Sequence, residues 1–191
     1  MVPFPMHNKE ARAEFFLLAS HYYISGRHAV ICGFIPVAAN LLHHAIEMYL
    51  KGTLTHWLSM AELKRLNHDL NKIWTKFRSL SEDQSLSRFD AAIRQLQRFE
   101  QLRYPDAVLR KGMSCQFALR RGDLVGVPRR FRPKASSYAL VLEDMDELVR
   151  VILDNAKTPP AGAFPGILHL HARAFLELHN AHVLPGVLIA T

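Results

Sequence analysis

The sequence predicts an all-α protein, an antiparallel up-and-down helical bundle with a long basic loop and an additional C-terminal helix. Apolar residues recur at three- and four-residue steps along most of the 191 residues. Helix-start and helix-stop residues separate these stretches, and no alternating strand pattern of any length interrupts them. The composition, 49% hydrophobic and 21% charged, is that of ordinary globular protein. Short connections between such helices favour antiparallel neighbours.

The first two helices are predicted over residues 8–25 and 36–51. One apolar stripe joins Ala11, Phe15, Leu18 and Tyr22, and the next joins Val37, Leu41, Ala45 and Met48. Pro36 suits the first position of a helix. Gly26 and Gly52 stand where glycine commonly ends a helix, so they are expected to stop these two.

The middle of the chain carries three helix starts. Ser59 and Glu62 form a capping box that opens a short helix ending near Leu66. Asp69 can cap the next helix, and Ser81 with Gln84 repeats the capping-box pattern before a long helix that Pro105 closes. The apolar stripes of these last two helices are Leu70, Ile73, Trp74 and Phe77, and then Leu86, Phe89, Ile93, Leu96 and Phe99.

The C-terminal third is predicted to hold two helices. Ser136 or Ser137 caps the first, with Val141, Met145, Leu148 and Ile152 buried and Asp144, Asp146 and Glu147 in solvent. Pro159 and Pro160 break it, and a final helix runs from about residue 166 to residue 182. We therefore expect a bundle over 1–157, including a loop over 105–135, and a helical appendage over 158–191 that packs on the bundle or on a second copy.

The positive charge is concentrated in one segment. Between Arg103 and Lys134 there are nine basic and two acidic residues, which equals the formal excess of +7 for the whole chain. The segment also holds glycines and prolines and predicts a long loop, with a short hairpin around Gln116 to Leu119. Positive charge within reach attracts nucleic acid because binding releases counterions from phosphates. The plain alternative is a solvated surface with no partner.

Three short motifs stand at the edges of predicted helices. They are Glu47 to Lys51 followed by Gly52, then Asn67-His68-Asp69-Leu70, then Leu102-Arg103-Tyr104-Pro105-Asp106. Together, over roughly residues 8–155, they resemble the HEPN superfamily (the higher eukaryotes and prokaryotes nucleotide-binding domain). The resemblance implies a helical bundle, a homodimer, and binding of RNA or of a nucleotide-bearing partner, as in toxin–antitoxin or stress and defence systems. A nucleotidyltransferase or an antitoxin would then be a protein partner.

Nucleic-acid binding is assigned to the basic loop and its mouth. We predict contacts from Arg103, Tyr104, Arg110, Lys111, Arg120, Arg121, Arg129, Arg130, Arg132 and Lys134. Arg103 and Tyr104 also have a structural explanation, because a basic residue and a following proline are typical of a helix end. Two alternatives remain open: a non-catalytic module for protein interaction or dimerisation, and a metal-independent endoribonuclease.

Ribonucleases of the superfamily carry an arginine followed, after four to six residues, by a histidine. The spacing occurs here as Arg173 and His179, which makes these two the weak candidates for catalysis. Ala174 departs from the polar residue that the family prefers after the arginine. Six residues of helix also turn the two side chains about 120° apart, which argues against a shared phosphate.

Several other site classes are not expected. His43, His44 and Glu47 lie on one helix, but no second copy of this pattern completes a metal centre, and no cofactor is expected. Glu47 and Lys51 are interpreted as a simple helical ion pair, and His68 as a structural residue at a helix start. Cys32 and Cys115 are far apart and suggest neither a disulfide nor a zinc site. No uncharged apolar run of about 18 residues predicts a membrane span, and a cytoplasmic protein is expected.

Overall fold

The computed structural model describes residues 6–81, 83–99, 115–122, 138–159, 163–164 and 170–182. These residues are mostly helical, as predicted. The elements are α1 (Met6–Ile31), α2 (Ile35–Leu54), α3 (Met60–Arg65), α4 (Leu70–Ser81), the 3-10 helix η1 (Gln84–Phe89), α5 (Asp90–Phe99), β1 (Cys115–Ala118), β2 (Tyr138–Val141), α7 (Leu142–Asn155) and α9 (Leu170–Glu177). None of the described helices is both long enough and apolar enough to cross a membrane.

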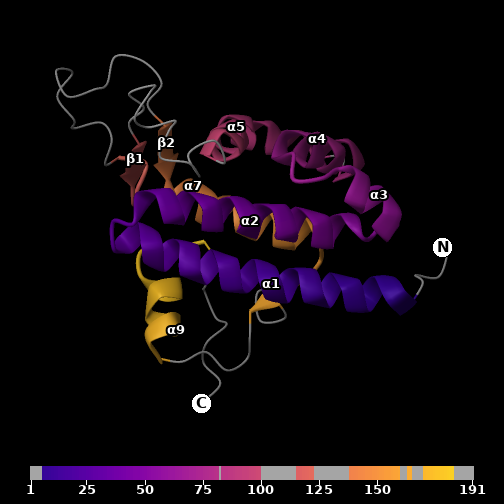
Figure 1. Cartoon of the computed structure of the whole chain (residues 1–191), viewed down its shortest axis with the longest axis horizontal. Helices are drawn as coiled ribbons and strands as arrows, with labels where there is room; N and C mark the ends of the chain where they lie inside the picture. The colour runs from indigo at the N-terminus through magenta and orange to yellow at the C-terminus, as the bar shows by residue number, and fades with distance from the viewer. Residues whose placement is uncertain are drawn as a thin grey trace.

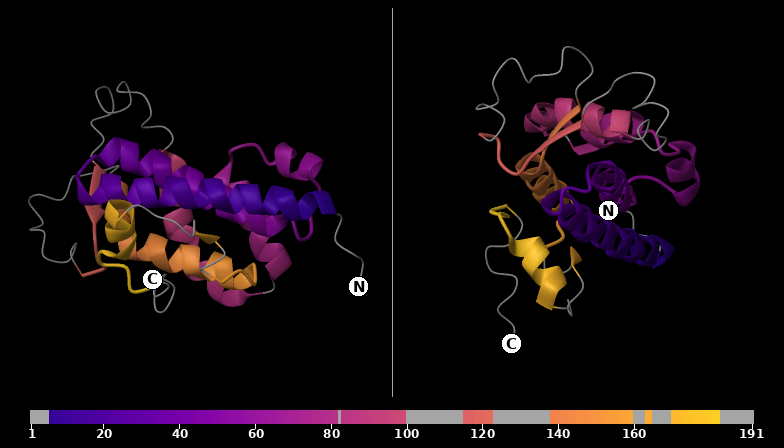
Figure 2. Two further views of the ribbon diagram at one scale, coloured as in Figure 1. Left: turned by 90° about the horizontal axis from the view of Figure 1, so that it is seen from below. Right: turned by 60° about the vertical axis from the view of Figure 1, so that its left-hand side comes forward.

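Helix α2 is the centre of the bundle. It contacts α1, α4, α5 and α7, whereas α9 packs against α1. In Figure 1 the layer formed by α3, α4 and α5 lies on one side of the α1–α2 pair and α9 lies on the other, and the turned views agree (Figure 2). Because α2 has neighbours on several sides, its apolar residues surround it instead of forming one stripe.

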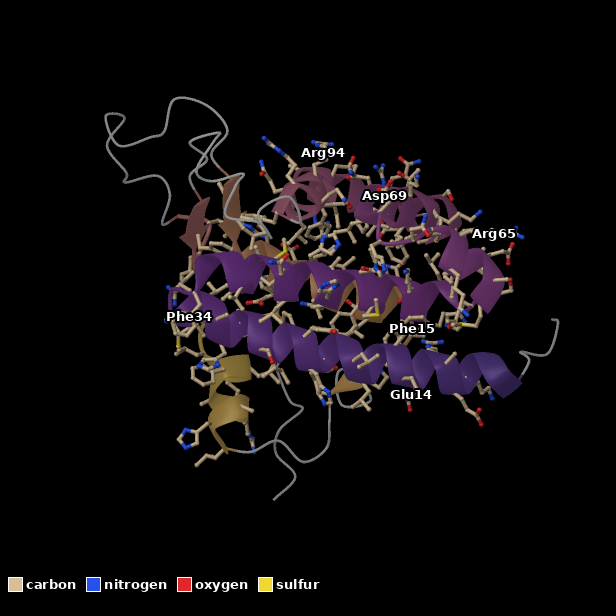
Figure 3. The ribbon with its side chains drawn as sticks, in the orientation of Figure 1. Glu14, Phe15, Phe34, Arg65, Asp69 and Arg94 are labelled. Carbon is tan, nitrogen blue, oxygen red and sulfur yellow. The ribbon has the colours of Figure 1, made fainter. Side chains whose placement is uncertain are left out.

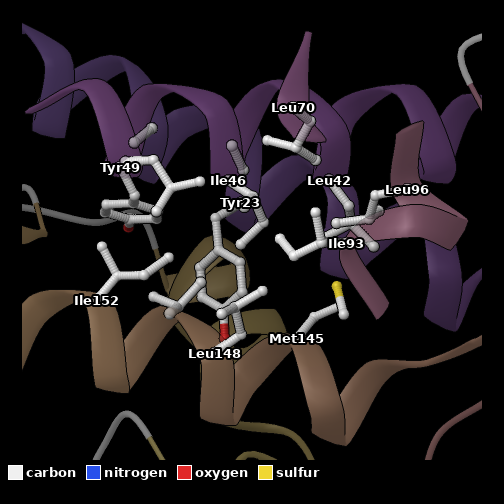
Figure 4. Packing of buried hydrophobic residues seen from close by; sticks show 14 of the residues in the cluster. Tyr23, Leu42, Ile46, Tyr49, Leu70, Ile93, Leu96, Met145, Leu148 and Ile152 are labelled. Atoms are coloured by element: carbon white, nitrogen blue, oxygen red, sulfur yellow. The ribbon is translucent and has the colours of Figure 1, made fainter. Parts of the chain in front are cut away.

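The core lies where these helices converge. Figure 4 shows Tyr23 of α1 and Ile46 of α2 facing Leu148 of α7. Leu96 of α5 and Leu70 of α4 close the same space, and all five side chains are buried. Contacts among five different helices therefore hold one continuous core, which burial of large apolar side chains stabilises by about 1.5–3 kcal/mol each.

The two glycines predicted as helix stops have another role. Helix α1 continues past Gly26 to Ile31, and α2 continues past Gly52 to Leu54. A Cβ atom on Gly52 would lie 2.7 Å from Cε1 of Phe16, and one on Gly26 would lie 2.9 Å from Cδ2 of Leu42. Both glycines are therefore needed for the close approach of α1 and α2, and the predicted stops were wrong.

The buried stripes predicted for the first two helices are confirmed in part. Ala45 is buried and Leu41 packs against the core, as predicted, whereas other positions differ. Phe16, Ala19 and Tyr23 are buried in α1, whereas the predicted Leu18 is 45% exposed. In α2 the predicted Val37 is 55% exposed, and its neighbour Ala38 is buried. The stripes predicted for α4 and α5 are confirmed, because every member is buried. Those two helices cover one face of the bundle, and a single stripe suffices there.

The helix starts are confirmed in part. Ser59 and Glu62 form the predicted capping box, and Asp69 Oδ1 accepts a hydrogen bond from the backbone N–H of Lys72. The second capping box was wrong: α4 extends through Ser81, and Asp83 caps η1 by accepting from the backbone N–H of Ser85. The predicted long helix is therefore divided into η1 and α5. Aspartate and serine are both favoured as N-cap residues, so Asp83 can take the capping position that was predicted for Ser81.

The predicted hairpin around Gln116 to Leu119 was wrong. Strand β1 pairs in parallel with β2, and Phe117 stands opposite Leu140. Strand β2 leads directly into α7, which begins at Leu142 after the extended residue Val141. Ser136 and Ser137, the predicted caps, lie outside the described residues. A strand that begins at Tyr138 leaves neither serine next to the start of α7.

A buried polar network joins α1, α7 and α9. Arg27, which is fully buried, pairs with Asp146, and the hydroxyl of Tyr23 donates to Oδ1 of Asp146 at 2.6 Å. Arg27 Nε donates to the carbonyl oxygen of Phe175 at 3.0 Å, near the end of α9. Asp146 was expected in solvent, which was wrong. Burial raises its pKa, and the charge of Arg27 opposes that rise.

Candidate functional site

Two of the three sequence motifs meet around Glu47. The carboxylate of Glu47 is fully buried on α2, and Lys51 Nζ, one helical turn later, donates to its Oε1 at 2.7 Å. The ring Nδ1 of His68, just before α4, lies 2.9 Å from the same oxygen and 3.2 Å from Oε2. We refer to Glu47, Lys51 and His68 as the Glu47 cluster. The interpretation of His68 and Lys51 as separate local features is thus too simple.

The cluster keeps Glu47 ionised. Burial by itself raises the pKa of Glu47, but the side chains of His44, Lys51 and His68 outweigh it and lower the pKa to about 2. Lys51 Nζ also donates to the carbonyl oxygen of Asn67 at 2.6 Å. Asn67 has a φ of 52°, a left-handed conformation that asparagine tolerates, and the turn before α4 is thereby held against α2.

The end of α5 contacts both α2 and the start of α4. The ring Nδ1 of His43 lies 3.2 Å from the carbonyl oxygen of Leu96, and the backbone N–H of Leu70 donates to Oε1 of Gln97 at 2.6 Å. Helix α5 thus ends beside the start of α4. The third motif, with Arg103, Tyr104 and Pro105, follows α5 in sequence but lies outside the described residues. Its position relative to Glu47 stays a prediction.

The cluster opens to solvent at His68. The side chain of His68 is 67% exposed, while Glu47 beneath it is fully buried. An ionised carboxylate on Nδ1 favours the proton on that nitrogen and leaves Nε2 available on the other side of the ring. The arrangement can orient an imidazole at the surface. Within the described part of the chain, no group of three or more metal-binding side chains gathers in a geometry that could hold a metal ion.

Two of the ten residues assigned to nucleic-acid binding are described. Arg121 Nε lies 2.6 Å from Oδ1 of Asp144, and its guanidinium also pairs with Glu143 and Glu147 on α7. Hydrogen bonds from the guanidinium to Asp144 and Glu147 raise the pKa of Arg121. Arg120 Nη2 lies 3.2 Å from Nδ1 of His179. The charge of Arg121 is therefore already balanced by neighbours, which leaves it less available to a phosphate.

The other eight residues of that set fall outside the described part of the chain, so their arrangement stays a prediction. They are Arg103, Tyr104, Arg110, Lys111, Arg129, Arg130, Arg132 and Lys134. The described ends of the segment that carries them are α5 on one side and β2 on the other. These two elements contact each other, so the segment begins and ends at the same region of the bundle.

The candidate catalytic pair is engaged with different partners. Arg173 Nε donates to Oε1 of Glu177 at 2.8 Å, one turn along α9. Helix α9 ends at Glu177, earlier than the predicted residue 182, and His179 follows it with a φ of 57°. His179 contacts Arg120. Arg173 and His179 thus contact different side chains, and their joint action on a phosphate stays a prediction.

Sequence reasoning missed the buried Arg27 and the joining of His68 to Glu47. Arg27 follows Tyr23 by one turn, in phase with the buried side of α1, and that phase is the signal that could have revealed it. Comparisons with protein-family models, with curated proteins and with solved structures gave no significant match.

Proposed function

We propose that the chain is a HEPN-like protein that binds RNA or a nucleotide-bearing partner through its basic segment. The observation that supports this most is the Glu47 cluster, in which the first two motifs of the resemblance are joined by hydrogen bonds to one buried carboxylate. Buried ionised groups with specific charged partners are concentrated at functional sites. The excess charge of the segment between Arg103 and Lys134 supplies the attraction for phosphate.

Binding is tested with a fluorescein-labelled single-stranded RNA across salt concentrations from about 50 to about 200 mM. A variant with Arg120→Gln, Arg129→Gln and Arg130→Gln should bind more weakly. Its log–log salt slope should fall by about 0.7 for each phosphate that the variant no longer neutralises. Equal binding by this variant and the wild type at low salt would remove the basic segment from the proposal.

Arg121→Gln provides an internal comparison. Because Arg121 is held by carboxylates of α7, its replacement should change the slope less than the replacement of one of the other arginines. RNA should remain intact in all these samples, since Arg173 and His179 contact different partners. Cleavage without metal that disappears in His179→Ala would instead support the alternative of an endoribonuclease.

A second candidate, a module for protein interaction or dimerisation, has one observation in its favour. Phe34 and Val37, where α1 turns into α2, are 59% and 55% exposed. Large apolar side chains that gather at a surface mark contact sites. Light scattering on Phe34→Ser/Val37→Ser compared with the wild type tests it, and an unchanged mass would remove this turn as a contact between copies.

A further inference from the structure

We infer that the outer side of the α3–α5 layer is a second phosphate-binding surface, which extends the nucleic-acid contact beyond the basic segment. The inference rests on the proposed function and names where on the described bundle the nucleic acid lies. We call this surface the α3–α5 face and define it by six cationic side chains. They are Lys64, Arg65, Lys72, Lys76, Arg94 and Arg98.

The charge balance of the layer favours a polyanion. Residues 60–99 contain eight basic and five acidic residues, although this stretch lies outside the segment that holds the formal excess. The excess of three positive charges in this layer attracts an approaching polyanion.

The described acidic side chains of the layer are already committed to local structure. Asp90 accepts from the indole N–H of Trp74 at 2.7 Å and pairs with Arg78 at 2.8 Å. Glu62 completes the capping box with Ser59, and Asp69 and Asp83 cap α4 and η1. Because these carboxylates are held in local hydrogen bonds and ion pairs, they compete weakly with phosphate for the surface cations.

Four of the six cations of the face have no carboxylate partner among the described residues. Within the described residues, no carboxylate lies within ion-pair distance of Lys64, Arg65, Lys76 or Arg94, and Lys72 has only a 3.4 Å contact with the half-exposed Asp69. Glu62 is close enough to Arg65 and Lys76 for both to help lower its pKa. Exposed lysine and arginine side chains without such partners remain available for phosphate.

Two of the cations, Arg65 and Arg94, lie on the same side of the molecule. Figure 3 shows Arg65, Asp69 and Arg94 along the outer side of the layer, away from α1. A shallow groove of about 500 Å³ follows α4, and Asn71, Lys72 and Lys76 are among the side chains that line it. Helix α5, which carries Arg94, ends at Phe99, four residues before Arg103 opens the basic segment. The face and the basic segment are therefore close in sequence, and we propose that one strand of nucleic acid contacts both.

The test is a neutralised variant with Lys64→Gln, Arg65→Gln and Arg94→Gln. The control carries the same change in charge elsewhere, with Lys9→Gln, Arg150→Gln and Lys157→Gln. With the same labelled RNA, the face variant should show a log–log salt slope reduced by about 0.7 for each phosphate it no longer neutralises, up to about 2.1 if all three cations bind phosphate. The control should stay within about 0.7 of the wild type. Circular dichroism and a urea melt check that both variants fold.

The outcomes separate the two proposals. If the wild type binds RNA and the face variant behaves like the control, the α3–α5 face is overturned while the proposed function stands. If neither the wild type nor the basic-segment variant shows salt-dependent binding to RNA, the proposed function fails, and the inference fails with it. If polyglutamate binds as tightly as RNA with the same dependence on these three cations, the face binds acidic protein and the commitment to nucleic acid is wrong.

Discussion

Replacing Glu47 by glutamine should destabilise the protein in a pH-dependent way. Glutamine keeps the size of the side chain but removes the charge that Lys51 and His68 contact, and leaving one member of a buried pair uncompensated costs about 3–5 kcal/mol. The pKa of Glu47 is lowered from 4.5 to about 2 in the folded protein, a difference equivalent to about 3 kcal/mol. The contribution is complete above pH 4.5 and is lost as the pH falls toward 2, because the unfolded chain binds the proton first.

The contribution of Glu47 to the free energy of unfolding can be measured by comparing two pH values. By about pH 3 the wild type should have lost about 2 kcal/mol of this contribution, whereas Glu47→Gln has none of it to lose. The gap in the free energy of unfolding between the two proteins should therefore narrow by that amount between about pH 7 and pH 3. Urea denaturation followed by tryptophan fluorescence measures it at both pH values.

The matched control is an ion pair of the same spacing on the surface. Arg150 and Asp154 are also four residues apart in a helix, with 3.5 Å between Nε and Oδ2, and both are exposed. Asp154→Asn should cost about 0.5 kcal/mol or less. Adding Lys51→Met to Glu47→Gln should recover part of the stability, since the uncompensated ammonium is removed. A gap that is the same at both pH values would refute the account of a buried, ionised Glu47.

Two further changes test how the helices pack. Gly52→Ala places a methyl group 2.7 Å from Cε1 of Phe16 and should destabilise by about 1–3 kcal/mol in a thermal melt, whereas Gly122→Ala, with no described atom within 4 Å, should be near neutral. Equal melting temperatures would contradict the close approach. Asp146→Asn leaves Arg27 buried without its carboxylate and should cost about 3–5 kcal/mol and speed proteolysis near α9. Unchanged cleavage there would show that Arg27 does not hold α9.

The sequence predicted the parts of the fold that depend on local chemistry. The capping box at Ser59 and the stripes of α4 and α5 were correct because neighbouring residues decide them. Gly52 was wrongly predicted to end a helix. A single sequence does not distinguish a glycine that ends a helix from one that allows another helix to pack closely. The difference lies in Phe16, which is remote in the chain and makes the small residue necessary.

The sequence predicted the individual residues of the candidate site but not the contacts that join them. Glu47, Lys51 and His68 were each named, but their shared carboxylate depends on the turn at Asn67 and on the packing of α4 against α2. The parallel pairing of β1 with β2 was likewise hidden, since a strand of four residues carries no sign of a partner far along the chain. Asp146 was expected in solvent because charged side chains usually lie at the surface.

The pairing of Tyr23 and Arg27 with Asp146 bears on how the chain folds. Tyr23 and Asp146 are separated by 123 residues. During synthesis, α1 and α2 are therefore made long before Asp146, the partner of Tyr23 and Arg27. Until α7 is made, Arg27 has no carboxylate partner in its buried position, so its charge stays in water. The contacts between α4 and α5 are local and can form earlier. We expect the last steps of folding to be the docking of α7 and then α9, and fragments that stop before Leu142 to remain open along α1.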